Sequence, residues 1–246
     1  MNIFNDFEDS LKNISTNAAK ESNWIEDDEQ RLGEQDPEQK TKEWFLKRLG
    51  KITGSKMPAF MKKGRGGDLW GETSKKIIYQ VVAEKTMNHA GRELYVEELM
   101  KKEYRQTMWG NKYEDAAREA LEERLNLKIE PVGSVKMNDL VASSPDGVVR
   151  AKIERVLHDN TYHEECCKYD NTTYNIPIEL KCPYDPIKHE LNRGLPFEIS
   201  KDFEYFWQMQ AHMVVMDAPL CVFASYDPRR SEDESMAIKV CFRDND

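Results

Sequence analysis

The stretch Ile178-Glu179-Leu180-Lys181 places a carboxylate and an ammonium group two residues apart. Side chains alternate along an extended chain, so Glu179 and Lys181 are expected to share one face of a strand, opposite their two apolar neighbours. The apolar neighbours suit burial against a core, whereas the paired charges need another explanation. Pro183 cannot continue a central strand, so the charges are expected at its end, where a rigid frame can present them.

A further carboxylate comes from the turn Ser144-Pro145-Asp146-Gly147, which lies between two short apolar runs that predict strands. Asp at a turn followed by Glu-x-Lys on a later strand can hold a divalent cation for phosphodiester hydrolysis, because hard carboxylate oxygens take Mg²⁺ or Mn²⁺. Lys181 could then orient or deprotonate a water, or stabilise developing charge. The structural alternative is an ordinary Asp-Gly turn and a solvated cross-strand pair.

Composition places the 246-residue chain among soluble globular proteins, with 39% hydrophobic and 33% charged residues. No apolar run approaches the length of a membrane span, and no basic region precedes an apolar core as in a secretory signal. The five cysteines fit neither a zinc-ribbon nor a disulfide pattern. We therefore expect a reducing, cytoplasmic compartment and no membrane association.

The formal net charge of −9 is distributed unevenly along the chain. Residues 1–38 hold eleven Asp or Glu against three Lys or Arg, and we expect an acidic leader that is partly helical or flexible. Residues 42–65 carry eight bases and one acid, which favours either a phosphate-contacting surface or merely a solvated basic face. The rest of the chain, 39–246, is expected to form one domain.

Two helices are expected near the basic segment. Residues Trp44 to Gly50 predict a short helix that ends at the glycine, and Thr53-Gly54-Ser55 predicts the start of another. Free backbone N–H groups at that start, with Arg48 nearby, could bind a phosphate, although ordinary capping is the alternative.

Later segments predict an alternation of helices and strands. Residues 110–126 form an amphipathic pattern in which Glu114 lies at the inner margin of the apolar stripe. A helix is expected over 201–216, with Tyr205 and Gln208 as polar exceptions on an apolar face, and strands are expected at 220–226 and 237–242.

Residues 150–175 are polar and separate Asp146 from Glu179, so we expect an extended hairpin or a surface insertion there. His158, His163 and two adjacent cysteines in this segment have poor spacing for a zinc site.

Six motifs follow one another along the chain: Arg48-Leu-Gly-x-Ile-Thr53-x-Ser55, Trp109-Gly110-x-x-Tyr113-Glu114, Ser144-Pro-Asp146-Gly, Ile178-Glu179-Leu-Lys181-Cys-Pro, Tyr205-x-x-Gln208-x-Gln210 and Tyr226-Asp-Pro-Arg229. In this order they resemble the phage lambda exonuclease, or YqaJ-like viral recombinase, family of PD-(D/E)XK nucleases over roughly residues 40–246. The resemblance implies an α/β (α+β) fold, in which helices flank a central mixed β-sheet around a restriction-endonuclease-like core.

The resemblance also implies an activity. Members of such a family would be Mg²⁺-dependent 5′-to-3′ exonucleases with two ions per site and Mn²⁺ as a substitute. They would act on linear double-stranded DNA and leave 3′ single-stranded overhangs for phage-type homologous recombination by strand annealing. A homotrimeric ring, a single-strand annealing protein as partner and a bacterial or phage-infected host cytoplasm are implied as well.

Site roles follow from the resemblance position by position. Asp146, Glu179 and the Leu180 carbonyl would bind the metal ions, Glu114 would complete the surroundings of the second ion, and Lys181 would handle the attacking water. Binding of the 5′-phosphate and of DNA is implied for Arg48, Thr53, Ser55, Ser144, Tyr205 and Gln208.

Other functions stay open at this point. An endonuclease or DNA-repair nuclease of the same superfamily would use the same metal site, and a DNA-binding or assembly module would lack catalysis. An iron–sulfur member is not favoured, because four suitably placed cysteines are missing. Intact Asp146, Glu179 and Lys181 argue against a module without catalysis.

Overall fold

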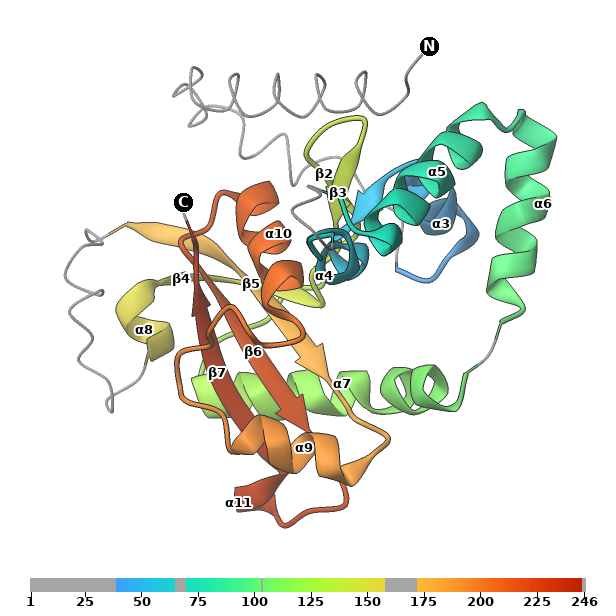
Figure 1. Ribbon diagram of the computed structural model, residues 1–246. Coiled ribbons are helices and arrows are strands. Elements are labelled where there is room, and N and C mark those ends of the chain that lie inside the picture. Colours follow the sequence, from blue (N-terminus) through green and yellow to red (C-terminus); the bar gives the residue numbers. More distant parts are fainter. Residues whose placement is uncertain (1–38, 65–69, 103, 158–171, 245–246) are drawn as a thin grey trace. The chain divides into compact units, whose positions relative to one another are not determined.

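A mixed four-stranded sheet carries the charged strand at its centre (Figure 1). The computed structural model describes residues 39–64, 70–102, 104–157 and 172–244. The strands run in the order β4 (Gly147–Lys152), β5 (Thr173–Lys181), β6 (Leu220–Tyr226) and β7 (Met236–Phe242). The β5 and β6 strands are parallel, and both outer pairs are antiparallel. This arrangement confirms the expected fold with a central mixed sheet.

A smaller three-stranded sheet and a set of helices complete the described part of the chain. The small sheet has the order β1 (Ile52–Thr53), β3 (Val141–Ser143) and β2 (Val135–Lys136). The helices are α3 (Lys42–Arg48), the 3₁₀ turn η2 (Gly54–Lys56), α4 (Met57–Phe60), α5 (Glu72–Thr86), α6 (His89–Met100), α7 (Arg105–Leu125), α8 (Ile153–Leu157), α9 (Pro186–Arg193), α10 (Phe206–Met216) and α11 (Glu232–Ser235).

Helices cover both faces of the four-stranded sheet. On one face, Leu121 and Leu125 of α7 pack with the inward residues of β5 and β6, including Ile178 and Val222. On the other face, α10 packs its apolar side against residues such as Phe223 (Figure 1). Because β6 is buried on both sides, its sequence is apolar without alternation, as is usual for a covered parallel strand.

The charged side chains of β5 lie on the face of the sheet that α10 covers. Ile178 and Leu180 are buried in the core on the α7 side, as their spacing predicted. Glu179 lies beside Phe223 of β6 in the parallel register, and Phe223 belongs to the core under α10. The alternation of a strand therefore separates the chemistry of β5 from its structural side chains.

Several element boundaries differ from the sequence prediction. The α7 helix begins at Arg105, before the expected start, and α10 begins at Phe206, so Tyr205 is its N-cap residue rather than a helical one. Thr53 precedes η2 without making a side-chain capping hydrogen bond. The α3 helix ends at Arg48, and Gly50 follows with a φ of 73°, a conformation that glycine adopts without strain.

The segment expected as a polar insertion contributes in part to the fold. β4 and β5 pair as an antiparallel hairpin as far as Lys152 and Thr173, so both ends of the 150–175 segment are strands. The adjoining α8 buries Ile153, Val156 and Leu157 in the core. The expected extended hairpin is therefore confirmed for 150–152 and 173–175, whereas 153–157 form a buried helical turn and not a surface insertion.

Some expectations concern residues outside those that the structure describes. They are the acidic leader at 1–38 and the possible zinc ligands His158, His163, Cys166 and Cys167. The described cysteines, Cys182, Cys221 and Cys241, are free thiols. No helix in the described ranges combines the length and the apolar character that crossing a membrane requires.

Candidate active site

Asp146 is fixed to β5 by two backbone hydrogen bonds. It lies in the turn between β3 and β4, where Pro145 and Gly147 end one strand and begin the next. The Asp146 N–H donates to the Ile178 carbonyl at 2.9 Å, and the Leu180 N–H donates to Asp146 Oδ2 at 2.7 Å. The turn and the Glu-x-Lys strand are thus held together, although about thirty residues separate them in the chain.

Glu179 is fully buried, and both of its oxygens accept hydrogen bonds. Oε1 accepts from Gln208 Nε2 at 2.7 Å and from the Lys181 ammonium, with which it forms an ion pair. Oε2 lies 2.6 Å from His212 Nε2. Gln208 and His212 come from successive turns of α10, so the helix that covers this face of the sheet also orients the carboxylate.

The three charged groups at the end of β5 perturb one another. Burial and the neighbouring charge of Glu179 raise the pKa of Asp146 to about 7. Burial alone would raise the pKa of Glu179 as well, but the charge of Lys181 and the His212 hydrogen bond outweigh it and lower that pKa. For Lys181, burial acts downward, and the two carboxylates exceed it and raise its pKa. Two close carboxylates in a dry site with one ammonium leave excess negative charge.

A pocket of about 710 Å³ opens at this end of β5. Its lining includes Asp146, Leu180, Lys181, Tyr205 and Glu114, so it joins five of the residues that the sequence pointed to. The Lys181 ammonium lies 5.1 Å from the centre of the Tyr205 ring, which is within range of a cation–π contact.

Glu114 reaches the pocket from α7 but is paired with bases. Its carboxylate lies 2.6 Å from Lys40 Nζ and 3.5 Å from Arg118 Nη2. Lys40 is held in place by its neighbour Gln39, whose amide donates to the carbonyls of Val132 and Pro145 at 2.7 and 2.9 Å.

The donor set at the pocket is of the type that divalent cations bind. Asp146, Glu179 and the Leu180 carbonyl offer only oxygen atoms, which is the ligand type of Mg²⁺ and Mn²⁺. Within the described ranges, no group of three or more His, Cys, Asp or Glu side chains is arranged to hold a metal. Glu114, the expected neighbour of a second ion, is bound to Lys40 instead. The excess negative charge around Asp146 is what a cation would neutralise.

Arg48 is a largely buried cation, and none of the hydrogen bonds and ion pairs found in the described ranges links it to an acid. Its Nη1 donates to Ser144 Oγ at 2.6 Å, and its guanidinium lies 4.0 Å from the ring centre of Trp44, one turn earlier on α3. Burial lowers the pKa of Arg48 to about 10. An unneutralised guanidinium beside a serine hydroxyl is a favourable place for an anion.

The other expected phosphate ligands are only partly brought together. Thr53 Oγ1 and Ser55 Oγ lie 3.2 Å apart, and Ser55 is exposed. Gln208, expected in the phosphate pocket, instead donates to Glu179. Tyr205 lines the pocket at the β5 end.

Sequence reasoning missed His212, which it did not single out on the helix expected at 201–216. Its spacing held a signal, because His212 follows Gln208 by four residues and therefore lies on the same face of α10. The polar face of that helix thus included His212 as well.

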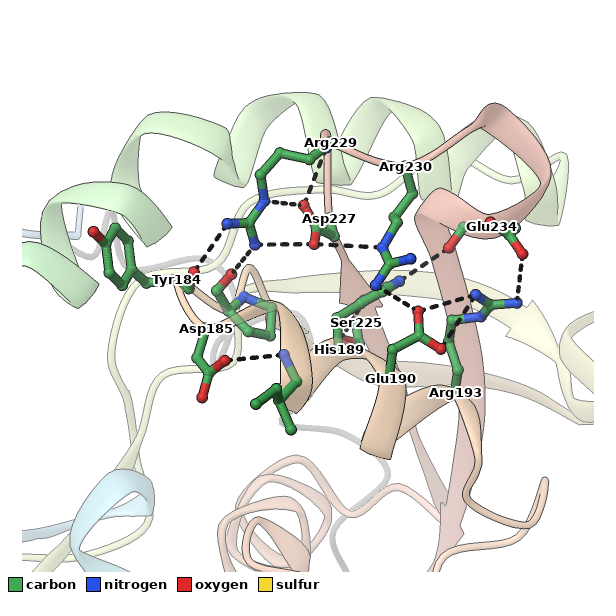
Figure 2. A network of polar contacts seen from close by, with 12 residues as sticks. Tyr184, Asp185, His189, Glu190, Arg193, Ser225, Asp227, Arg229, Arg230 and Glu234 are labelled. Carbon is green, nitrogen blue, oxygen red and sulfur yellow. Dashed lines mark hydrogen bonds and ion pairs between the residues drawn. The ribbon is translucent and has the colours of Figure 1, made fainter.

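The rim of the pocket is held by a salt-bridge network around Asp227, shown in Figure 2. Arg229 binds the buried Asp227 through Nε at 2.7 Å and donates to the carbonyls of Tyr184 and Pro183 at 3.1 and 3.3 Å. It also lies 4.7 Å from the ring centre of Trp109 on α7. Arg229 therefore ties the segment after Lys181 to the loop after β6 and to α7.

Solved exonucleases share this fold. The alkaline exonuclease LHK-Exo from Laribacter hongkongensis has 22% sequence identity and a TM-score of 0.57, over 83% of this chain and 84% of that chain. The same values hold for its complex with dAMP. A phage-related exonuclease from Haemophilus somnus 129PT has 14% identity and a TM-score of 0.51, over 79% of this chain and 85% of that one. The fold is thus that of a class of exonucleases.

The family follows from the sequence itself. Residues 43–219 match the YqaJ-like viral recombinase domain, and the chain belongs to this family. No curated protein matches the chain significantly. Family membership and fold together support a nuclease role.

Proposed function

We propose that this protein is a Mg²⁺-dependent exonuclease that degrades the 5′-ended strand of linear double-stranded DNA, with Mn²⁺ as a substitute ion. The observation that carries the proposal is the end of β5, where Asp146 and Lys181 line one pocket and the buried Glu179 is paired with Lys181. Membership of the YqaJ-like viral recombinase family supports it. Among structures of this fold, LHK-Exo has been solved with dAMP, a nucleoside monophosphate of the kind an exonuclease releases.

In this proposal Asp146, Glu179 and the Leu180 carbonyl hold the metal, and Glu114 joins the second ion once it leaves Lys40. Bound there, the ions would supply activation of water and neutralisation of charge on the phosphate oxygens. Lys181 is a cation in this arrangement, and it can donate hydrogen bonds to the attacking water and to the phosphate. Tyr205 limits where the Lys181 ammonium can lie.

End recognition is assigned to Arg48 and Ser144. Ser144 stands two residues before Asp146, so the turn that positions a metal ligand also carries the hydroxyl that Arg48 binds. A guanidinium can bind a terminal phosphate with two parallel hydrogen bonds, and the buried position strengthens the interaction. Thr53 and Ser55 would add donors at the same end, whereas Gln208 would act through Glu179.

Three duplex substrates test the proposal: linear DNA with 5′-phosphate ends, linear DNA with 5′-hydroxyl ends, and covalently closed circles. We expect Mg²⁺-dependent loss of linear DNA, release of mononucleotides from the 5′ end, and intact circles. Asp146→Asn should abolish cleavage and retain duplex binding in a gel-shift assay. Full activity in EDTA would refute the proposal, cleavage of circles would favour an endonuclease, and binding without cleavage would indicate a module without catalysis.

The assembly and the recombination role rest on family resemblance. We propose a homotrimer around DNA and a single-strand annealing protein that takes over the 3′ overhang. Light scattering at assay concentration measures the first, and a stable monomer with full activity would contradict it. Copurification with an annealing protein encoded beside the gene would test the second.

A further inference from the structure

Three buried polar side chains form a hydrogen-bonded row that ends at the proposed metal ligand, Glu179. Ser143 Oγ is 2.6 Å from His212 Nδ1, and His212 Nε2 is 2.6 Å from Glu179 Oε2. All three residues are fully buried, and they come from β3, α10 and β5. Three elements that are distant in the sequence thus meet in one chain of hydrogen bonds.

The direction of these hydrogen bonds follows from the donor inventory. A carboxylate only accepts, so His212 Nε2 carries a hydrogen and donates it to Glu179. In the neutral imidazole, Nδ1 is then the acceptor, and the Ser143 hydroxyl is placed to donate to it. Glu179 thereby sets the tautomer of His212, and the Ser143 hydroxyl satisfies the other ring nitrogen.

His212 holds the oxygen of Glu179 that the other donors leave. Gln208 and Lys181 both bind Oε1, so removal of His212 would leave Oε2 without a partner in a dry site. The carboxylate could then rotate toward another donor. Residues that hydrogen-bond to a metal ligand fix its orientation, and their loss commonly weakens metal affinity about 10- to 100-fold.

Gly54, in the turn proposed to bind phosphate, packs directly against Ser143 and His212 of this row. A Cβ atom there would lie 2.6 Å from Ser143 Oγ and 3.3 Å from His212 Cε1. The backbone between Thr53 and Ser55 is therefore packed directly against the pair that orients Glu179.

We propose that His212, hydrogen-bonded to Ser143 through its other ring nitrogen, is a positioning residue that holds Glu179 in the orientation that binds the divalent cation. The proposal rests on the proposed function of this site as a metal-dependent nuclease. His212 acts through Glu179 and takes no part in bond cleavage itself.

His189 provides a matched control. It is the other fully buried histidine in the described ranges, its Nδ1 lies 3.0 Å from Ser225 Oγ, and its Nε2 lies 3.0 Å from the Glu234 carbonyl (Figure 2). It has the same burial and the same kind of serine partner but does not contact Glu179. His189→Ala therefore reproduces the loss of a buried imidazole without changing the proposed ligand.

The test measures Mn²⁺ binding by titration calorimetry and cleavage kinetics for the intact protein and its variants. For His212→Ala we expect a Kd for Mn²⁺ raised about 10- to 100-fold, a lower kcat and an unchanged KM for duplex ends. His212→Gln retains an amide N–H donor and should recover part of the affinity. His189→Ala should unfold at a lower temperature and bind Mn²⁺ as the unaltered protein does.

Each outcome decides between the proposals. If the unaltered protein binds Mn²⁺ and cuts DNA while folded His212→Ala binds equally well, the positioning role alone is refuted. If His189→Ala weakens Mn²⁺ binding as much as His212→Ala, the effect is general and the positioning role is again refuted. If the unaltered protein neither binds Mn²⁺ nor cuts DNA, both proposals fall. Should His212→Ala not fold, His212→Phe, which fills the space but lacks the N–H donor, replaces it, and an unchanged Kd in that variant contradicts the inference.

Discussion

Replacing Arg48 with alanine is expected to remove the preference for 5′-phosphorylated DNA ends. Burial lowers the pKa of Arg48 from 12.5 to about 10, which corresponds to a penalty on the order of 3 kcal/mol for the charged guanidinium. A bound phosphate would offset this penalty. A hydrogen bond to a charged group contributes about 1.5–3 kcal/mol, so its loss should slow the reaction about 10- to 100-fold.

The assay compares degradation rates of two duplexes that differ only in a 5′-phosphate or a 5′-hydroxyl. Arg48→Ala should reduce the rate on the phosphorylated duplex much more, so that the ratio of the two rates approaches one. Arg48→Lys keeps the charge but lacks the planar fork and the stacking on Trp44, so it should restore only part of the ratio. Arg92→Ala, on α6 beside the end of α3, is the control and should leave the ratio unchanged.

A stability measurement distinguishes the phosphate role from a structural one. Arg48→Ala loses the Ser144 hydrogen bond and the Trp44 contact, but it also removes a buried charge without an acidic partner, so we expect little change in Tm. If the variant slows both substrates by one factor, Arg48 contacts the duplex backbone or supports the fold, and the reasoning is refuted.

Three further predictions concern other parts of the structure. Burial alone would raise the pKa of Asp227, but Arg229 outweighs it and lowers that pKa, so the stabilisation by Asp227 is present above about pH 4 and is lost as pH falls through its folded value. Asp227→Asn should therefore melt several degrees lower at pH 7, and the difference in Tm should shrink as pH falls below about 4, whereas a constant difference over this change of pH would contradict the assignment. Replacing 158–171 with a short turn should preserve cleavage. A deletion that extends through 153–157 should also lower the Tm, because it removes core residues, and equal Tm values for the two deletions would refute this. Gly54→Ala should weaken Mn²⁺ binding without removing a polar group, and an unchanged Kd would show that the packing can relax.

The composition of the site was visible in the sequence because it depends on local geometry. The alternation along β5 assigned Ile178 and Leu180 to the core and Glu179 to the other face, and the structure confirms both. The spacing of apolar residues likewise predicted most of α7. These features follow from backbone periodicity, which a short stretch of sequence contains in full.

The partners of those residues depended on packing between distant segments. No local pattern states that α10 crosses β5 so that Gln208 and His212 both reach Glu179. The resemblance therefore assigned Gln208 to the phosphate, and His212 was not singled out. The 153–157 segment was misjudged for the same reason, because its few apolar residues are buried only where β4 and β5 pair.

The sequence by itself determined which residues could do chemistry and in what order they occur, since residue type and local periodicity need no tertiary contact. Only the tertiary structure decided the charge balance of the site. Whether Arg48 has an acidic partner and whether Glu114 faces Lys40 depend on how α3, α7 and the turn before β4 lie in space. Electrostatic energies vary with distance and burial, and both arise only when the chain has folded.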